Sequence, residues 1–164
     1  MGGTVSLAQR HRLARDAAAP SPLLTQAGAS LVLGGTDPQR AAALRPAADT
    51  LFAPRGVAGR PDGPLVVSDT GHHRLLLWHT MPRQDRTPAD LVLGQPDAAG
   101  EARNRGAAVG PLGLNVPVGV ALAGEVLAVA DSWNHRVLIW HGLPRTPDRA
   151  PDVLPVVTPT GNSG

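Results

Sequence analysis

Two adjacent histidines, His72 and His73, lie between an aspartate and an arginine in the stretch SDTGHHRLLLWH, residues 68–79. Neutral imidazole is a common metal ligand and the usual general base near neutral pH. The pair therefore indicates either a metal or catalytic site or a structural role. The sequence on both sides of the pair distinguishes these alternatives.

The stretch is one copy of an internal repeat, since the same order of residues returns in ADSWNHRVLIWH, residues 130–141. The copy continues outward, because LFAPRGVA from Leu51 is echoed by LNVPVGVA from Leu114, and ADLVLG from Ala89 resembles ASLVLG from Ala29. Such a repeat is typical of folds built from stacked supersecondary units. The repeat signature consists of Asp69, His73, Arg74 and Trp78, then Asp131, His135, Arg136 and Trp140.

Four short strands are expected in each copy, from apolar and β-branched runs bounded by turn residues. After His73, Leu75 and Leu77 fall on one face and Leu76 and Trp78 on the other, so both faces need cover. A repeated four-stranded antiparallel unit of this kind is a propeller blade. We therefore expect an all-β chain, a partial β-propeller with two four-stranded antiparallel blades and a possible half-blade. The expected strands are 56–60, 65–69, 73–79, 91–94, 119–123, 126–131, 135–141 and a weak 153–157.

The N-terminal segment has two interpretations. HRLARDAAAP from His11 aligns with HRLLLWHTMP from His73 as a remnant strand, whereas Ser6 and Gln9 form a capping box that would start a short Ala-rich helix. Both remain open. The expected organisation is this segment at 1–28, an outer strand of a preceding blade and a long loop at 29–50, a blade at 51–97, an inter-blade loop at 98–113, a second blade at 114–157 and a tail at 158–164.

Two further motifs accompany the signature. PRGVA from Pro54 precedes LVVSDTGHHRLLLW, and PVGVA from Pro117 precedes LAVADSWNHRVLIW. Together these motifs resemble the NHL repeat, and ADLVLGQPD followed by Asn104 is similar to a long-blade bacterial form of it. The resemblance covers about residues 29–157 and implies a β-propeller, commonly of six blades, that most often serves in binding. His72 stands where that family usually has Asn, and Trp133 where Gly is usual.

Within such a repeat the histidines have a structural explanation. Asp69 and Arg74 flank one hairpin, where a short Asx turn and a cross-strand ion pair account for both residues. His73 and His135 recur because the blade recurs, and equivalent residues diverge around a ring instead of converging on a metal. We therefore expect no metal site, no cofactor and no catalytic residue.

Function is expected at the end of the blades that carries the turn between the second and third strands and the loops at 35–54 and 95–117. Those loops are longer than a blade connection requires, which is where recognition residues concentrate. An exposed Trp with nearby Arg is typical of a binding hot spot, although Trp133 has the alternative of lying over the neighbouring loop. The candidate binding residues are Trp133, Asn134, His72, Arg103 and Arg105.

Composition narrows the classes of function. The chain has 164 residues, a net charge of +2 from 15 basic and 13 acidic side chains, and no cysteine. The basic residues are all scattered arginines, so nucleic-acid binding through a clustered basic stripe is not indicated. No stretch approaches the roughly 20 apolar residues that span a bilayer, and no signal peptide is evident, so a soluble, cytoplasmic protein is expected.

The sequence therefore favours a non-catalytic scaffold that binds an unknown protein or small ligand. The alternative is a piece of a propeller enzyme, of lyase or hydrolase type, whose site lies in further blades, because the inner runs GVAGR and GVALA offer no acid, base or ligand. Two blades do not close a ring. We expect a fragment of a longer propeller, with a homo-oligomer that closes the ring by assembly as the alternative.

Overall fold

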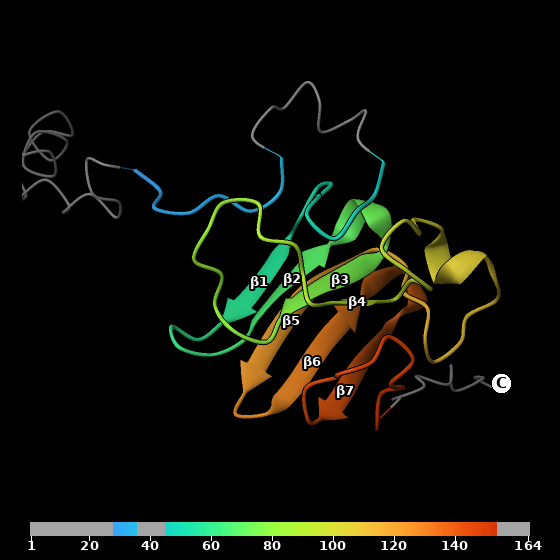
Figure 1. The fold of residues 1–164 in the computed structure, drawn as a ribbon. Coiled ribbons are helices and arrows are strands. Elements are labelled where there is room, and N and C mark those ends of the chain that lie inside the picture. Colours follow the sequence, from blue (N-terminus) through green and yellow to red (C-terminus); the bar gives the residue numbers. More distant parts are fainter. Residues whose placement is uncertain (1–27, 36–44, 154–164) are drawn as a thin grey trace, which may run out of the picture. The chain divides into compact units, whose positions relative to one another are not determined.

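The computed structural model describes residues 28–35 and 45–153. The chain divides into two units, Met1–Ser30 and Leu31–Gly164, and every strand described belongs to the second. These residues form two antiparallel sheets without an α-helix, which confirms the all-β class (Figure 1). The alternatives for the N-terminal segment, apart from Gly28, and the tail at 158–164 lie outside the described residues. None of the helices described is long and apolar enough to cross a membrane.

The first sheet, called blade one, has four strands in sequence order. The second strand has the predicted bounds, whereas the third begins one residue late because His73 has a left-handed backbone (φ 54°) that a strand cannot contain. A short 3-10 turn, η1 (Thr70–His72), joins the two. The strands are β1 (Gly56–Gly59), β2 (Leu65–Asp69), β3 (Arg74–Trp78) and β4 (Leu91–Leu93).

The second sheet, called blade two, repeats this pattern with three strands, β5 (Pro117–Ala123), β6 (Val126–Asp131) and β7 (Arg136–His141). The 3-10 turn η3 (Ser132–Asn134) corresponds to η1 and also ends in a left-handed histidine, His135 (φ 52°). The expected fourth strand is represented by a single bridge between Ile139 and Val153, and residues 154–157 lie outside the described ones. The two sheets are therefore blades of a partial β-propeller.

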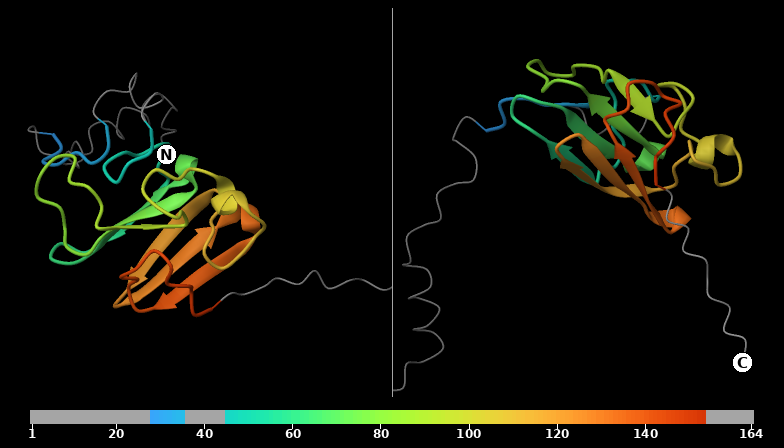
Figure 2. Two further views of the ribbon diagram at one scale, coloured as in Figure 1. Left: turned by 45° about the vertical axis from the view of Figure 1, so that its right-hand side comes forward. Right: turned by 90° about the horizontal axis from the view of Figure 1, so that it is seen from below.

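The blades lie side by side and share one core (Figure 2). Their first strands approach closely, since a Cβ on Gly56 would lie only 2.2 Å from the backbone oxygen of Val118. Glycine is required there because any side chain would separate the two backbones. The core between the blades consists of Val66, Leu75, Leu77, Leu91 and Leu93 with Leu114, Leu127, Val129, Leu138 and Trp140.

The other face of blade one carries a second apolar cluster, with Leu33 packed against it. Residues 31–34 have no strand pairing among the described residues. Their packing nevertheless resembles that of the outer strand β4, because a Cβ on Gly34 would lie 3.1 Å from Leu51 and one on Gly94 would lie 2.7 Å from Leu114. The segment thus lies against blade one as β4 lies against blade two.

Candidate binding face

A fully buried carboxylate organises the turn end of blade one. One oxygen of Asp69 accepts the backbone N–H of Phe52 at 2.6 Å, and the other accepts His72 Nδ1 at 2.8 Å and Arg74 Nε at 2.7 Å. Because a carboxylate only accepts, Nδ1 of His72 must carry a proton. The expected ion pair is present, but the Asx turn was a wrong interpretation, since the Asp69 side chain accepts no hydrogen bond from a backbone N–H of η1.

Blade two repeats this arrangement around Asp131. Its oxygens accept the N–H of Asn115 at 2.7 Å, Asn134 Nδ2 at 2.7 Å and Arg136 Nε at 2.8 Å. Asn134 therefore does in blade two what His72 does in blade one, because each side chain donates one hydrogen bond to the buried carboxylate. The departure of His72 from the expected Asn is chemically conservative.

The two arginines extend these clusters into the loops. Arg74 donates to the carbonyl oxygens of Ala47 and Thr50 at 2.9 and 3.0 Å and to that of Ala98 at 2.6 Å. Arg136 donates to the backbone oxygens of Gly110 and Gly113 at 2.8 and 2.7 Å. Charge-assisted bonds of this kind hold the loops against the hairpin, so the surface above them is preorganised.

His73 joins the two blades. Its Nδ1 accepts the backbone N–H of Val116 at 3.0 Å, so that nitrogen is unprotonated and the ring is neutral. Burial lowers the pKa of His73 below its ordinary value, and the positive charge of Arg103 and the neighbouring His72 lower it further, against an opposing effect of Asp131. Burial and hydrogen bonding thus favour the same neutral form.

Two aromatic side chains remain exposed above this frame, Trp133 at 64% and Phe52 at 45%. The two aromatic residues occupy different positions of the repeat, since Phe52 corresponds to Asn115 and Trp133 corresponds to Gly71. The backbone contact between the two positions is the same in both blades: Gly71 N–H donates to the Phe52 oxygen at 2.9 Å, and Trp133 N–H donates to the Asn115 oxygen at 3.1 Å. A Cβ on Gly71 would lie 2.2 Å from the Phe52 ring. Blade one therefore pairs a large Phe52 with Gly71, and blade two a small Asn115 with Trp133.

The candidate residues from the sequence divide into two groups. Trp133 and Arg103 are exposed, while Asn134 and His72 are tied to the carboxylates and His72 is buried. Arg105 donates to the Gln95 oxygen at 2.9 Å and to Asp148 at 3.0 Å. No group of three or more possible metal ligands forms among residues 28–35 and 45–153.

Sequence reasoning missed Phe52, whose ring lies 5.5 Å from that of His72. Asn104 was noted in the sequence only as part of a motif and not as a site residue, yet it exchanges side-chain hydrogen bonds with Asn134. Comparing the repeats position by position would have identified Phe52, since LFAP against LNVP and TGHH against SWNH show the reciprocal change in size. We call the three exposed side chains Phe52, Arg103 and Trp133 the binding face.

Comparison with known proteins bears on the repeat. Residues 114–140 match the family described as NHL repeat. That range holds the start of blade two, its central hairpin and the Asp131 cluster. A search of curated proteins found no match to the chain.

Proposed function

We propose that this chain is a non-catalytic binding module of NHL type, which captures a protein partner at the binding face. The observation that carries this proposal is an exposed Trp133 on a turn whose flanking residues Asp131 and Asn134 are held by side-chain hydrogen bonds. A rigid aromatic anchor loses little conformational entropy on binding, and Trp and Arg dominate binding hot spots.

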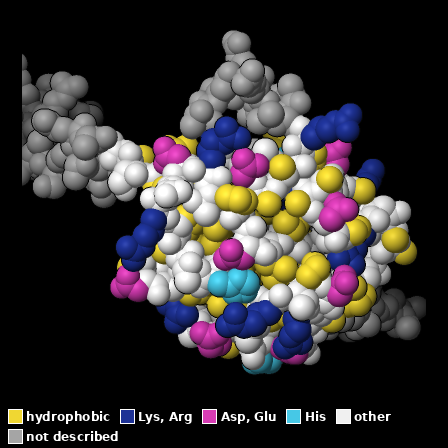
Figure 3. Space-filling view, in the orientation of Figure 1, with side chains coloured by type: hydrophobic (Ala, Val, Ile, Leu, Met, Phe, Trp, Pro, Cys, Tyr) yellow, Lys and Arg dark blue, Asp and Glu magenta, His cyan; other side chains and the backbone are white. Residues whose placement is uncertain are grey.

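Charge supports a protein partner over a nucleic acid. Arginines and carboxylates are interspersed over the face shown in Figure 3, so no large surface of one sign is evident there. Electrostatic binding of nucleic acid needs a clustered basic surface. The Arg105–Asp148 and Arg86–Asp49 ion pairs, each 3.0 Å, balance two of the loop arginines locally.

The inner strands favour binding over catalysis. β1 reads GVAG and β5 reads PVGVALA, so neither carries a side chain that could act as an acid or a base. A propeller enzyme with its site at the inner strands would draw its groups from such positions. These two blades offer a frame for recognition instead.

The test compares the wild type with Trp133→Ala, Arg103→Ala and the control Arg145→Ala, whose side chain is exposed on the loop after β7. Each is immobilised and exposed to lysate of the source cells, and retained proteins are identified by mass spectrometry and then titrated in purified form. We expect at least one partner to bind the wild type and the control alike, and to lose tenfold or more in affinity with Trp133→Ala.

Thermal unfolding separates loss of binding from loss of fold. Gly71 at the equivalent position shows that a blade forms without a large side chain there, so Trp133→Ala should melt with the wild type. If every retained partner bound Trp133→Ala and the wild type with equal affinity, that result would contradict the assignment of the binding face.

A further inference from the structure

The contact between the two blades has polar and steric components as well as the shared core. Thr70 Oγ1 donates to the backbone oxygen of Pro117 at 2.6 Å, beside the bond from Val116 to His73. Toward the other end of the blades, His79 Nε2 donates to the oxygen of Pro144 at 3.1 Å. Gly56 lets the backbones meet in between. Blade one therefore contacts blade two through four specific residues, Thr70, His73, His79 and Gly56.

The same four features recur on the far side of blade two, at Ser132, His135, His141 and Gly119. The side chains of Ser132 and His135 make no hydrogen bond among the described residues, and neither does Nε2 of His141. A Cβ on Gly119 would have Ala130 Cβ as its nearest neighbour, at 3.5 Å. Blade two is thus equipped for a contact that the described structure does not contain.

An apolar surface accompanies these residues. Val66, Leu75 and Leu77 are fully buried between the blades, whereas their counterparts Ala128, Val137 and Ile139 are half-buried or exposed, Val137 at 42%. The alternation of β5, β6 and β7 puts these counterparts on one face with Gly119. We call this the open face, formed by Gly119, Ala121, Ala128, Ala130, Val137 and Ile139.

Blade one carries the complementary surface. Ala53 and Pro54 correspond to Val116 and Pro117, and Ala53 shares the unusual backbone of Val116, with φ of 49° against 52°. Pro54 is exposed where Pro117 is buried. Val57 is 68% exposed, although its counterpart, Val120, packs against the core between the blades. We call this the leading face, formed by the exposed Ala53, Pro54 and Val57 together with the buried Pro82.

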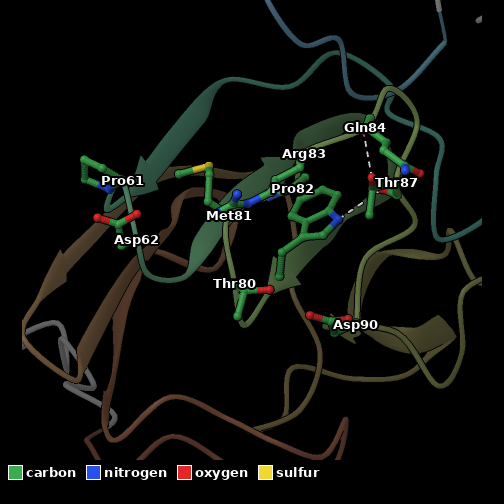
Figure 4. A pocket seen from close by; sticks show the side chains of 10 residues that line it. Pro61, Asp62, Thr80, Met81, Pro82, Arg83, Gln84, Thr87 and Asp90 are labelled. Atoms are coloured by element: carbon green, nitrogen blue, oxygen red, sulfur yellow. Dashed lines mark hydrogen bonds between the residues drawn. The ribbon is translucent and has the colours of Figure 1, made fainter.

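Cavities mark the leading face as incomplete. One of about 550 Å³ lies beside Trp78 and is lined by Met81, Pro82 and Arg83 (Figure 4). A small pocket of about 10 Å³ lies beside the equivalent Trp140, and Leu93 and Gly94 of blade one are among the residues that line it. Pro82 is buried but lines this cavity, and it corresponds to Pro144, the acceptor of His79, so its oxygen is at the position where His141 of a neighbouring blade would bond.

We propose that the open face binds the leading face of a second copy of this chain, head to tail, repeating the contact between blades one and two. His135 Nδ1 accepts the N–H of Ala53 of the second copy, Ser132 donates to its Pro54 oxygen, and His141 donates to its Pro82 oxygen. A heterologous contact whose rotation closes produces a ring. Rings of four to eight blades, typical of propellers, correspond to two to four copies.

The first test is the mass of the full 164-residue chain by size exclusion with light scattering over a series of concentrations. We expect a discrete oligomer of two to four copies. A monomer at every concentration up to about 100 μM would overturn the proposal. Gly119→Val should weaken association at least tenfold, because its side chain would meet the backbone of the second copy as a Cβ on Gly56 would meet Val118. Gly110→Ala, outside both faces, should have no effect.

Mixing tests the polarity. Val57→Asp blocks the leading face and Val137→Asp blocks the open face, so each variant alone should be monomeric. Together they should form a one-to-one dimer through the two intact faces and stop there, which also shows that both are folded. A contact between two open faces would instead leave Val57→Asp dimeric by itself, and that result, or failure of the mixture to associate, would contradict the head-to-tail arrangement.

Discussion

Asp69 and Arg74 face each other across the hairpin between β2 and β3, 2.7 Å apart and both fully buried. The pair has its counterpart in Asp131 and Arg136, 2.8 Å apart, although Arg136 is slightly exposed. Ionised groups in the interior are stable only when their remaining hydrogen-bonding sites are also satisfied. The contacts of Asp69 with Phe52 and of Arg74 with the loops meet that requirement.

Replacing Asp69 with Asn should therefore destabilise the chain strongly. The substitution leaves the Arg74 charge buried without its partner, which typically costs about 3–5 kcal/mol. Urea denaturation followed by circular dichroism measures the change, with Asp62→Asn, an exposed aspartate, as the matched control. A loss below about 1 kcal/mol would mean that Arg74 finds other compensation.

The equivalence of His72 and Asn134 predicts that His72→Asn is nearly neutral, within about 1 kcal/mol of the wild type. His72→Phe should cost more, about 1–3 kcal/mol, because Phe fills the space beside Phe52 but cannot donate to Asp69. The same denaturation experiment compares them. The reverse order would show that ring packing against Phe52, not the hydrogen bond, determines the residue.

Stability should fall as the pH decreases below the ordinary histidine pKa of about 6.5, because the unfolded chain then binds a proton that folded His73 resists. The contribution of His73 is present above that pH and is lost as the pH falls toward the lowered pKa of the folded state. His73→Asn tolerates the left-handed backbone and keeps an acceptor without titrating. Its free energy of unfolding should depend less on pH between about 5 and 7, and an identical slope in both proteins would remove His73 as the cause.

Exchanging side chains between the blades tests the reciprocal packing of Phe52 and Gly71. Gly71→Trp alone should destabilise blade one by about 1–3 kcal/mol, the typical cost of overpacking, since any Cβ there meets Phe52. Adding Phe52→Asn, which copies Asn115 of blade two, should recover most of that loss. A double-mutant cycle measures the coupling, and purely additive effects would show that the two positions do not share space.

The fold was predictable to the extent that it depends on local sequence. The bounds of β2 and β6 agree with the prediction because each run is apolar and ends at the aspartate of the signature. The start of β5 at Pro117, two residues before the predicted Gly119, was not predictable, because a register irregularity extends its pairing with β6.

The candidate site depends on contacts between distant residues, and there sequence reasoning reached less far. The partner of Asp69 that replaces the expected Asx turn is the N–H of Phe52, at a sequence separation of 17. Burial of His72 follows from the same convergence of remote segments. Trp133 could be identified because its departure from the repeat is visible in the sequence itself.

Arg74 and Arg136 hold the loops through backbone oxygens, and Gln95 does the same with the oxygens of His72, His73 and Ala102. Every amino acid supplies that oxygen, so the loop side chains can change while the frame that fixes them stays intact. The architecture therefore separates stability from specificity. Libraries that randomise the exposed loop positions, and leave both Asp–Arg pairs in place, would start from a scaffold suited to new recognition.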